Sequence, residues 1–195
     1  MSLTPAFQIG LWNAWIFSAF MLLSMIIPDF FMSEEARKRT KRAQQFVPFK
    51  KKINKVLALS THVVIMPLAI IYSIFLPLKT GTAWFYTGLV IFIAAMVVSY
   101  LTTLCFIRTP MDKPFTDGIY RISRHPVYLS GFLFYLSMAI ASVSWIMLLF
   151  AVLWILFFHI VVRDEESHLI NLYGEAYRSY MDRTPKWIGL PKPVV

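Results

Sequence analysis

Five apolar stretches, separated by polar segments, organise this chain. They lie at about Ile9–Ile27, Val56–Leu76, Trp84–Ile107, Val127–Ala141 and Val143–Val162. A hydrocarbon layer of about 30 Å is crossed by an α-helix of roughly 20 apolar residues. Because lipid cannot hydrogen-bond an open backbone, each stretch is expected to be helical. The pattern therefore predicts an all-α, polytopic membrane bundle of about five helices.

The last two stretches are joined only by the short uncharged segment Ser-Val-Ser-Trp, which predicts a tight helical hairpin. Polar residues of the chain are concentrated after residue 108. We therefore expect a single membrane domain. Residues 1–107 would hold three spans and a basic cytoplasmic loop, and residues 108–195 would hold the hairpin and a cytoplasmic tail.

Composition supports the membrane assignment. The chain of 195 residues is 58% hydrophobic and 15% charged, whereas soluble domains average about 25% charged residues. A water-soluble globular protein is excluded by these values. The first eight residues hold no basic region of the kind that opens a cleaved signal peptide, so the first span is expected to be retained.

The lysines and arginines predict the orientation of the chain. Nine of the 19 lie in the loop Pro28–Lys55, four in Arg108–Arg124 and five from Arg163 onward, whereas Lys79 is alone on the opposite side. Since positive charge marks the cytoplasmic face, the N-terminus is expected outside and the tail inside. Orientation and anionic headgroups explain the net charge of +9, so membrane lipids are expected as partners and nucleic acid is not.

Four positions before residue 108 carry further expectations. Ser33, followed by two glutamates, predicts the start of a helix in the basic loop. Pro67 predicts a kink in the second span. His62 places a polar ring in the same span, either to bond a neighbouring helix or to contact a ligand. Cys105 stands alone in mid-span, so no internal disulfide is possible.

The tail after Asp164 predicts an amphipathic helix. Leu169, Tyr173, Tyr177 and Tyr180 follow one another at intervals of four, four and three residues, which places them on one helix face. We expect this helix to lie against the membrane surface or to fold back over the hairpin.

Polar residues occupy both ends of the hairpin at one depth. Arg124, His125 and Tyr128 surround Pro126 where the fourth span begins, and proline suits the first turn of a helix.

The fifth span ends in a matching polar set. If its helix continues to about Ser167, then His159, Arg163 and Glu166 share one face. Because the two helices are antiparallel, the first set should meet Arg163, Glu165 and Glu166 in space.

Simpler explanations exist for single residues. Arg124 and Arg163 could be cytoplasmic anchors, and Tyr128 a tyrosine of the interfacial belt. The acids at 164–166 could cap the tail helix. A hairpin that needed only anchoring would have no use for a histidine, paired acids and two arginines at one depth, because polar groups there are costly unless paired or functional. The joint pattern therefore favours a site.

Two segments carry a resemblance to a known family. They are GIYRISRHPVYLSG, from Gly118, and RDEESHLINLYGEAYRSYMDRTPKWIG, from Arg163. Together they resemble the C-terminal signature of the isoprenylcysteine carboxyl methyltransferase and phospholipid methyltransferase family of membrane enzymes. The matching positions are Arg124, His125, Pro126, Tyr128, Arg163, Glu166, Leu169, Gly174, Tyr177 and Tyr180. Where the family often has Val-Pro-Arg, this chain has Thr184-Pro185-Lys186, so a two-point arginine contact is not carried over.

The resemblance implies a methyltransferase that uses S-adenosylmethionine, with no metal. That cofactor needs cations or donors for its carboxylate, acceptors for its ribose and amino groups, and an apolar slot for adenine. The candidate cofactor-binding residues are Arg124, His125, Pro126, Tyr128, Leu129, Glu165, Glu166 and Leu169.

Methyl transfer is an in-line displacement, so the main tasks are to position the nucleophile and to exclude water. An acceptor with a carboxylate needs no base and would be held by Arg163. An amine or hydroxyl acceptor would need a proton taker, for which His159 is the nearest candidate. Arg163 and His159 are therefore the candidate catalytic residues. A prenylated cysteine carboxylate, a phospholipid amine and other small lipophilic acceptors all stay open.

Two other functions also stay open. Membrane sterol reductases carry a similar signature on a longer chain, and the basic residues Arg121, Arg124, Arg178 and Arg183 could serve NADPH, although the chain has no G-x-G-x-x-G motif. A non-catalytic membrane scaffold would explain the helices but would leave the paired polar sets unused.

Overall fold

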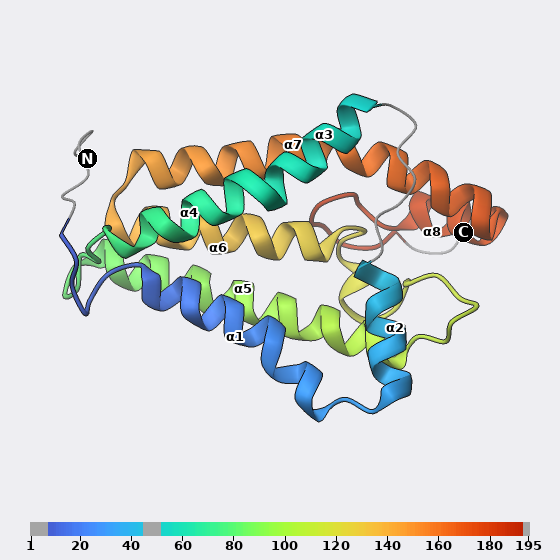
Figure 1. Ribbon diagram of the computed structural model, residues 1–195. Coiled ribbons are helices and arrows are strands. Elements are labelled where there is room, and N and C mark those ends of the chain that lie inside the picture. Colours follow the sequence, from blue (N-terminus) through green and yellow to red (C-terminus); the bar gives the residue numbers. More distant parts are fainter. Residues whose placement is uncertain (1–7, 45–51, 193–195) are drawn as a thin grey trace.

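The fold is a bundle of helices that run alongside one another (Figure 1). The computed structural model describes residues 8–44 and 52–192, so most of the segment used to argue against a signal peptide lies outside the described residues. The helices are α1 (Trp15–Phe31), α2 (Glu34–Gln44), α3 (Lys52–Ser60), the π-helical turn η1 (Thr61–Ile65), α4 (Met66–Ile74), α5 (Ala83–Arg108), the 3₁₀ turn η2 (Gly118–Arg121), α6 (Pro126–Ser142), α7 (Trp145–Tyr173) and α8 (Glu175–Arg183). The predicted all-α class is confirmed.

Three helical runs are long and apolar enough to cross a membrane: Lys52–Ile74, Ala83–Arg108 and Trp145–Tyr173. The two other apolar helices, α1 and α6, have 17 residues each. All five lie between the same two ends of the bundle, as Figure 1 shows. These are the helices of an integral membrane protein.

The first apolar helix begins later than predicted. The pattern predicted a span from Ile9, but α1 starts at Trp15. The reason is a set of contacts with the loop after α4: the side-chain amide of Asn13 donates to the carbonyl oxygen of Ile74 at 2.8 Å, and residue 14 donates to the carbonyl oxygen of Leu76 at 2.8 Å. Residues 8–14 therefore close this end of the bundle instead of extending the helix.

The second span is interrupted close to the predicted position. The π-helical turn Thr61–Ile65 ends two residues before Pro67, whose missing N–H disturbs the regular ladder. His62 lies in this turn, with Nδ1 3.0 Å from the carbonyl oxygen of Ala58. The rings of His62 and Phe158 pack edge to face, with their centroids 5.8 Å apart. His62 thus packs against α7, a neighbouring helix.

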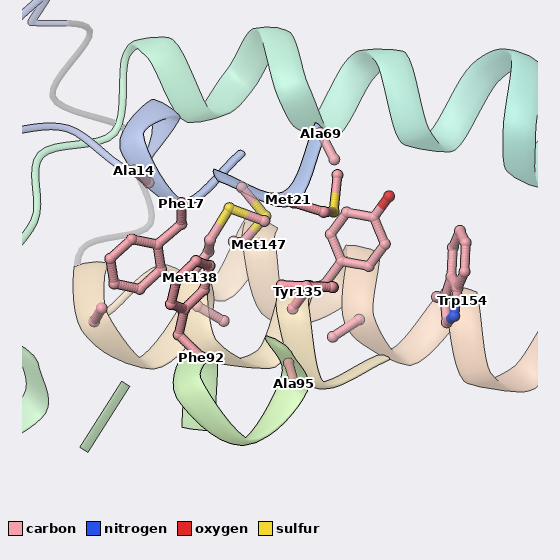
Figure 2. Packing of buried hydrophobic residues seen from close by; sticks show 14 of the residues in the cluster. Ala14, Phe17, Met21, Ala69, Phe92, Ala95, Tyr135, Met138, Met147 and Trp154 are labelled. Carbon is pink, nitrogen blue, oxygen red and sulfur yellow. The ribbon is translucent and has the colours of Figure 1, made fainter. Parts of the chain in front are cut away.

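The core is formed around α6, which lies between α5 and α7. Figure 2 shows how aromatic and methionine side chains from α1, α5, α6 and α7 fill the space between these helices. Phe17, Phe92, Tyr135, Met138 and Met147 are all nearly inaccessible to solvent. Since lipid is as apolar as these side chains, the bundle depends on close packing for its stability.

One glycine allows the closest helix approach. A Cβ atom at Gly88 of α5 would lie 2.7 Å from the backbone nitrogen of Ala141 and 2.7 Å from the carbonyl oxygen of Ser137, both on α6. Backbone cannot move aside as a flexible side chain can. We therefore expect Gly88→Ala to destabilise the fold by about 1–3 kcal/mol, measured by thermal unfolding in detergent. Val90→Ala, which truncates an outward-facing side chain of the same helix, is the control and should change little; equal stability of the two variants would contradict this packing.

The hairpin predicted for α6 and α7 is present. Val143 turns the chain in the left-handed region, with φ 55° and ψ 46°, and the hydroxyl of Ser144 then accepts a hydrogen bond from the backbone of Met147 at the start of α7. Ser33 likewise accepts from the backbone of Ala36 at 3.2 Å, which confirms the predicted start of α2.

The predicted single tail helix is wrong. α7 continues without a break past Asp164 to Tyr173, so the acids at 164–166 lie inside a helix and cap nothing. The helix ends at Gly174, which has a positive φ of 60°, and α8 begins at Glu175. Leu169 and Tyr173 therefore belong to α7, and the two later tyrosines belong to α8.

Cys105 is also misplaced by the sequence pattern. It lies near the end of α5 and not in mid-span, and its thiol donates to the carbonyl oxygen of Asp117 at 3.3 Å.

Candidate active site

The loop before α6 fixes the position of His125. The backbone N–H of His125 donates to the hydroxyl of Ser123 at 3.1 Å, and that of Arg124 donates to the carbonyl oxygen of Pro185 at 3.1 Å. Pro126 follows as the first residue of α6, fully buried. The side chain of His125 is only 2% exposed and therefore meets its partners on α7 almost without water.

Glu166 of α7 is the centre of the polar cluster. Its Oε1 lies 3.1 Å from Nε2 of His125 and 3.4 Å from Nη1 of Arg124, and its Oε2 lies 3.6 Å from Nζ of Lys186. Three basic side chains from two separate segments therefore surround the carboxylate of Glu166, whose side chain is 10% exposed. A buried charge is tolerated when it is paired in this way.

Glu165 forms the second half of the cluster. Its Oε2 accepts a hydrogen bond from the hydroxyl of Tyr128 at 3.1 Å and lies 3.7 Å from Nδ1 of His125. The ring of Tyr128 stacks on that of Phe158, with centroids 4.0 Å apart. The two polar sets predicted to meet across the hairpin therefore do so.

Arg163 is the exception within these sets. Glu166 pairs with Arg124, His125 and Lys186, and no ion pair among the described residues joins it to Arg163. The Arg163 side chain is exposed, and none of the ion pairs found among the described residues includes it. This arginine is thus available to a group outside the cluster.

The last described segment returns across the site. Residues 184–192, called the strap below, are held against residues 122–124: Ser123 donates to the carbonyl oxygen of Lys186 at 3.4 Å, and Gly189 donates to that of Ile122 at 3.2 Å. The strap places Lys186 on Glu166 and also brings Trp187 to His159, whose Nδ1 accepts from the indole Nε1–H at 3.2 Å.

The comparison with known families bears on this cluster. The sequence model of the phospholipid methyltransferase family matches residues 78–176, half of the chain. The chain belongs to the phospholipid methyltransferase family. The match runs from the loop before α5 to the start of α8, so it includes the hairpin and both polar sets. The family inferred from the two motif segments is confirmed.

A curated relative points in the same direction. Protein-S-isoprenylcysteine O-methyltransferase of Schizosaccharomyces pombe is 35% identical to this chain over 77 residues. The match covers 38% of this chain and 32% of the relative, so it spans well under half the length of the yeast protein.

The remaining predicted residues of this phospholipid methyltransferase family member lie in two places. Leu129 follows Tyr128 on α6 and is half-buried. Leu169 packs instead into a second apolar cluster with Tyr120, Tyr177 and Tyr180, whereas Tyr128 packs against the main core. The sequence grouped Leu129, Leu169 and Tyr128 as one adenine slot, and the structure separates Leu169 from that group.

The tyrosines of this second cluster secure α8 to the site. The hydroxyl of Tyr180 donates to the carbonyl oxygen of Tyr120 at 2.7 Å. Burial raises the pKa of Tyr180 and that of Tyr177, so both stay neutral near physiological pH. The bond from Tyr180 therefore persists over the working range of pH and holds α8 to the turn that precedes Arg124.

Three of the four basic residues considered for NADPH have hydrogen-bond or ion-pair partners on their own segment of the chain. Arg121 pairs with Asp117 at 3.1 Å, and Arg178 lies 4.0 Å from Glu175, each partner being on the same short segment. Arg183 donates to the backbone of residue 179. Of the four, only Arg124 contributes to the cluster.

Sequence reasoning missed two contributors, Trp187 and Asn54, and left the role of Lys186 open. Lys186 stands where the family often has arginine, and both it and Trp187 reach the site through the strap. Asn54 of α3 donates to Oδ2 of Asp164 at 2.8 Å in a buried contact 110 residues apart in sequence, which attaches the second span to the acidic segment of α7. Neither contact has a sequence spacing that could predict it.

Proposed function

We propose that this chain is an integral membrane methyltransferase that moves a methyl group from S-adenosylmethionine to a lipophilic acceptor. One observation carries the proposal: the family's paired motifs converge on Glu166, while Nε of Arg124 in the same cluster is buried without a hydrogen-bond partner among the described residues. A buried donor left unpaired costs free energy, which a ligand that accepts from it would recover. The relative's printed name supports methyl transfer to an oxygen.

The residues present fit S-adenosylmethionine. The free Nε–H of Arg124 suits the carboxylate of the methionine part, with Glu166 holding the guanidinium in place through Nη1. Glu165 uses one oxygen for Tyr128 and keeps capacity to accept from an amino group or a ribose hydroxyl. In this proposal Pro126 and Leu129 supply the apolar surroundings, and Leu169, which packs in the second cluster, does not.

The cofactor supplies an activated methyl group on a sulfonium centre, and the chain positions the reactants and excludes water. The stacked rings of Tyr128 and Phe158 form an aromatic surface beside the carboxylates, suited to a cationic centre. Arg163 and His159 would hold the acceptor, since they follow each other by one helical turn on α7 and are both exposed. No residue of the chain needs to act as a nucleophile in this scheme.

We further propose that the polar end of the hairpin faces the cytoplasm and that residues 108–195 form the catalytic part. In Figure 1 the basic helix α2 and the C-terminal helix α8 lie at one end of the bundle, opposite the N-terminal end of the described chain. That distribution agrees with an outside N-terminus. The cofactor would then enter from the aqueous side, and a lipophilic acceptor would enter from the bilayer.

Calorimetry on the purified chain in detergent tests the proposal. S-adenosylhomocysteine should bind in a saturable manner, whereas NADPH should give no binding heat beyond dilution. Saturable binding of NADPH alone would replace the methyltransferase with a reductase, and binding of neither ligand would favour a scaffold.

A further inference from the structure

The contact between Trp187 and His159 defines the protonation of an exposed histidine. The indole nitrogen is a donor only, so Nδ1 of His159 must be the acceptor in the 3.2 Å bond. A neutral imidazole that accepts at Nδ1 carries its proton on Nε2. The bond therefore selects one tautomer.

The donor that makes this selection is held independently of His159. Trp187 belongs to the strap, which is hydrogen-bonded through residues 185, 186 and 189 to residues 122–124. The centroid of its ring lies 6.0 Å from that of the His125 ring and 6.0 Å from that of the His159 ring. The second pair is stacked, with an interplanar angle of 28°. Trp187 is thus fixed by the site and can orient a histidine that is itself exposed.

The Nε2–H group of His159 lies where an unpaired hydrogen-bond donor costs free energy. His159 lies on α7 between Leu156 and Ile160, which are 53% and 43% exposed and belong to the outward face of an apolar helix. A hydrogen-bond donor on such a face is unfavourable unless a ligand accepts from it. Arg163, one turn further along, adds a second outward donor at the boundary of the apolar segment.

We propose that Trp187 is a positioning residue that holds His159 as the Nε2–H tautomer, and that His159 and Arg163 together bind an anionic oxygen of the lipophilic acceptor. The inference rests on the proposed function for the identity of the ligand, and on geometry alone for the tautomer. It assigns His159 the role of a donor, whereas the sequence suggested a proton taker. The anionic oxygen belongs to a carboxylate or to a lipid phosphodiester, since both offer the same acceptor chemistry.

The tautomer is measured by nitrogen NMR on the full chain labelled with ¹⁵N-histidine, in maltoside micelles that carry no anionic group. The His159 signals are identified among those of the four histidines by their loss in a His159→Gln variant. Wild-type His159 should show an unprotonated Nδ1 and a protonated Nε2. Trp187→Phe keeps a ring in place but removes the N–H donor, so the proton should redistribute between the two nitrogens. A proton on Nδ1 in the wild type, or the same tautomer in both proteins, would overturn the positioning role whether or not the chain transfers methyl groups.

Three additions then test the anion. N-acetyl-S-farnesylcysteine has a free carboxylate, its methyl ester has none, and phosphatidylethanolamine supplies a phosphodiester. We expect the His159 Nε2–H signal to move with the free acid or with the phospholipid, and the one that acts identifies the source. Arg163→Ala should weaken that response about tenfold, the loss of one charge-assisted bond. An equal response to the methyl ester, or a response to none of the three, would overturn the anion site.

Discussion

Replacing Glu166 with glutamine is expected to reduce the affinity for S-adenosylhomocysteine by roughly 10- to 100-fold, the loss of a charge-assisted hydrogen bond. The substitution keeps the shape of the side chain but removes the charge that holds Arg124, His125 and Lys186 within 3.6 Å of one carboxylate. Arg124 and Lys186, left without their common anionic partner, will repel each other and move apart. The guanidinium of Arg124 would then lose the position that its free Nε–H needs. Calorimetry measures the change in affinity.

Two further variants separate this effect from a general loss of structure. Glu175→Gln on α8 removes an exposed carboxylate whose side chain is 88% accessible, and it should leave affinity and unfolding temperature unchanged. Lys186→Arg keeps the positive charge beside Glu166 and should also bind normally. If Glu166→Gln bound S-adenosylhomocysteine as the wild type does while its unfolding temperature stayed the same, the cofactor site would have to lie elsewhere.

Arg163→Ala is expected to abolish most of the methyl-transfer turnover while the affinity for S-adenosylhomocysteine stays within a few-fold. Arg163 is exposed and Glu166 is already paired with other cations, so its removal leaves the cofactor cluster intact. The lost interaction is the charge-assisted hydrogen bond between Arg163 and the acceptor, worth about 1.5–3 kcal/mol. This corresponds to a loss of roughly 10- to 100-fold in turnover when the acceptor concentration is limiting. The turnover of Arg163→Lys should lie between that of the wild type and that of Arg163→Ala, because lysine keeps the charge but not the planar two-point geometry.

The matched control for this prediction is Arg178→Ala, which removes another exposed arginine from the neighbouring helix α8. Its turnover and cofactor affinity should both remain near wild type. Loss of cofactor binding in Arg163→Ala would assign Arg163 to the cofactor wall. A greater loss of turnover in His159→Ala than in Arg163→Ala, with a dependence on pH, would instead point to an amine acceptor and a proton taker.

The hairpin and its polar cluster could be predicted because both depend on short-range patterns. The uncharged link between the last two apolar stretches predicted two antiparallel helices. Helical periodicity was less accurate, because it put Glu166 on one face with His159 and Arg163, whereas Glu166 is buried and the other two are exposed. The motif residues Arg124 and His125 then had to lie at the same depth as the acids. Local spacing and the known thickness of a bilayer were sufficient for this part.

The parts that failed depend on where the chain turns and on contacts between distant residues. Leu169 has the periodicity of a surface helix together with Tyr177, but the positive φ of Gly174 divides the two between α7 and α8. The strap carries Lys186 and Trp187 back to the hairpin through backbone bonds that no side-chain pattern encodes. Helix periodicity says which residues share a face, and it says nothing about where a chain turns back.

The central claim is that the cluster around Glu166 serves methyl transfer to a lipophilic acceptor. Its most direct test is the transfer of a tritiated methyl group from S-adenosylmethionine by the purified chain, embedded in nanodiscs of a total lipid extract, into material extracted by organic solvent. We predict label in the organic phase for the wild type and at least about tenfold less for Glu166→Gln. Equal label in both proteins, or none with the wild type although it binds S-adenosylhomocysteine, would contradict the claim.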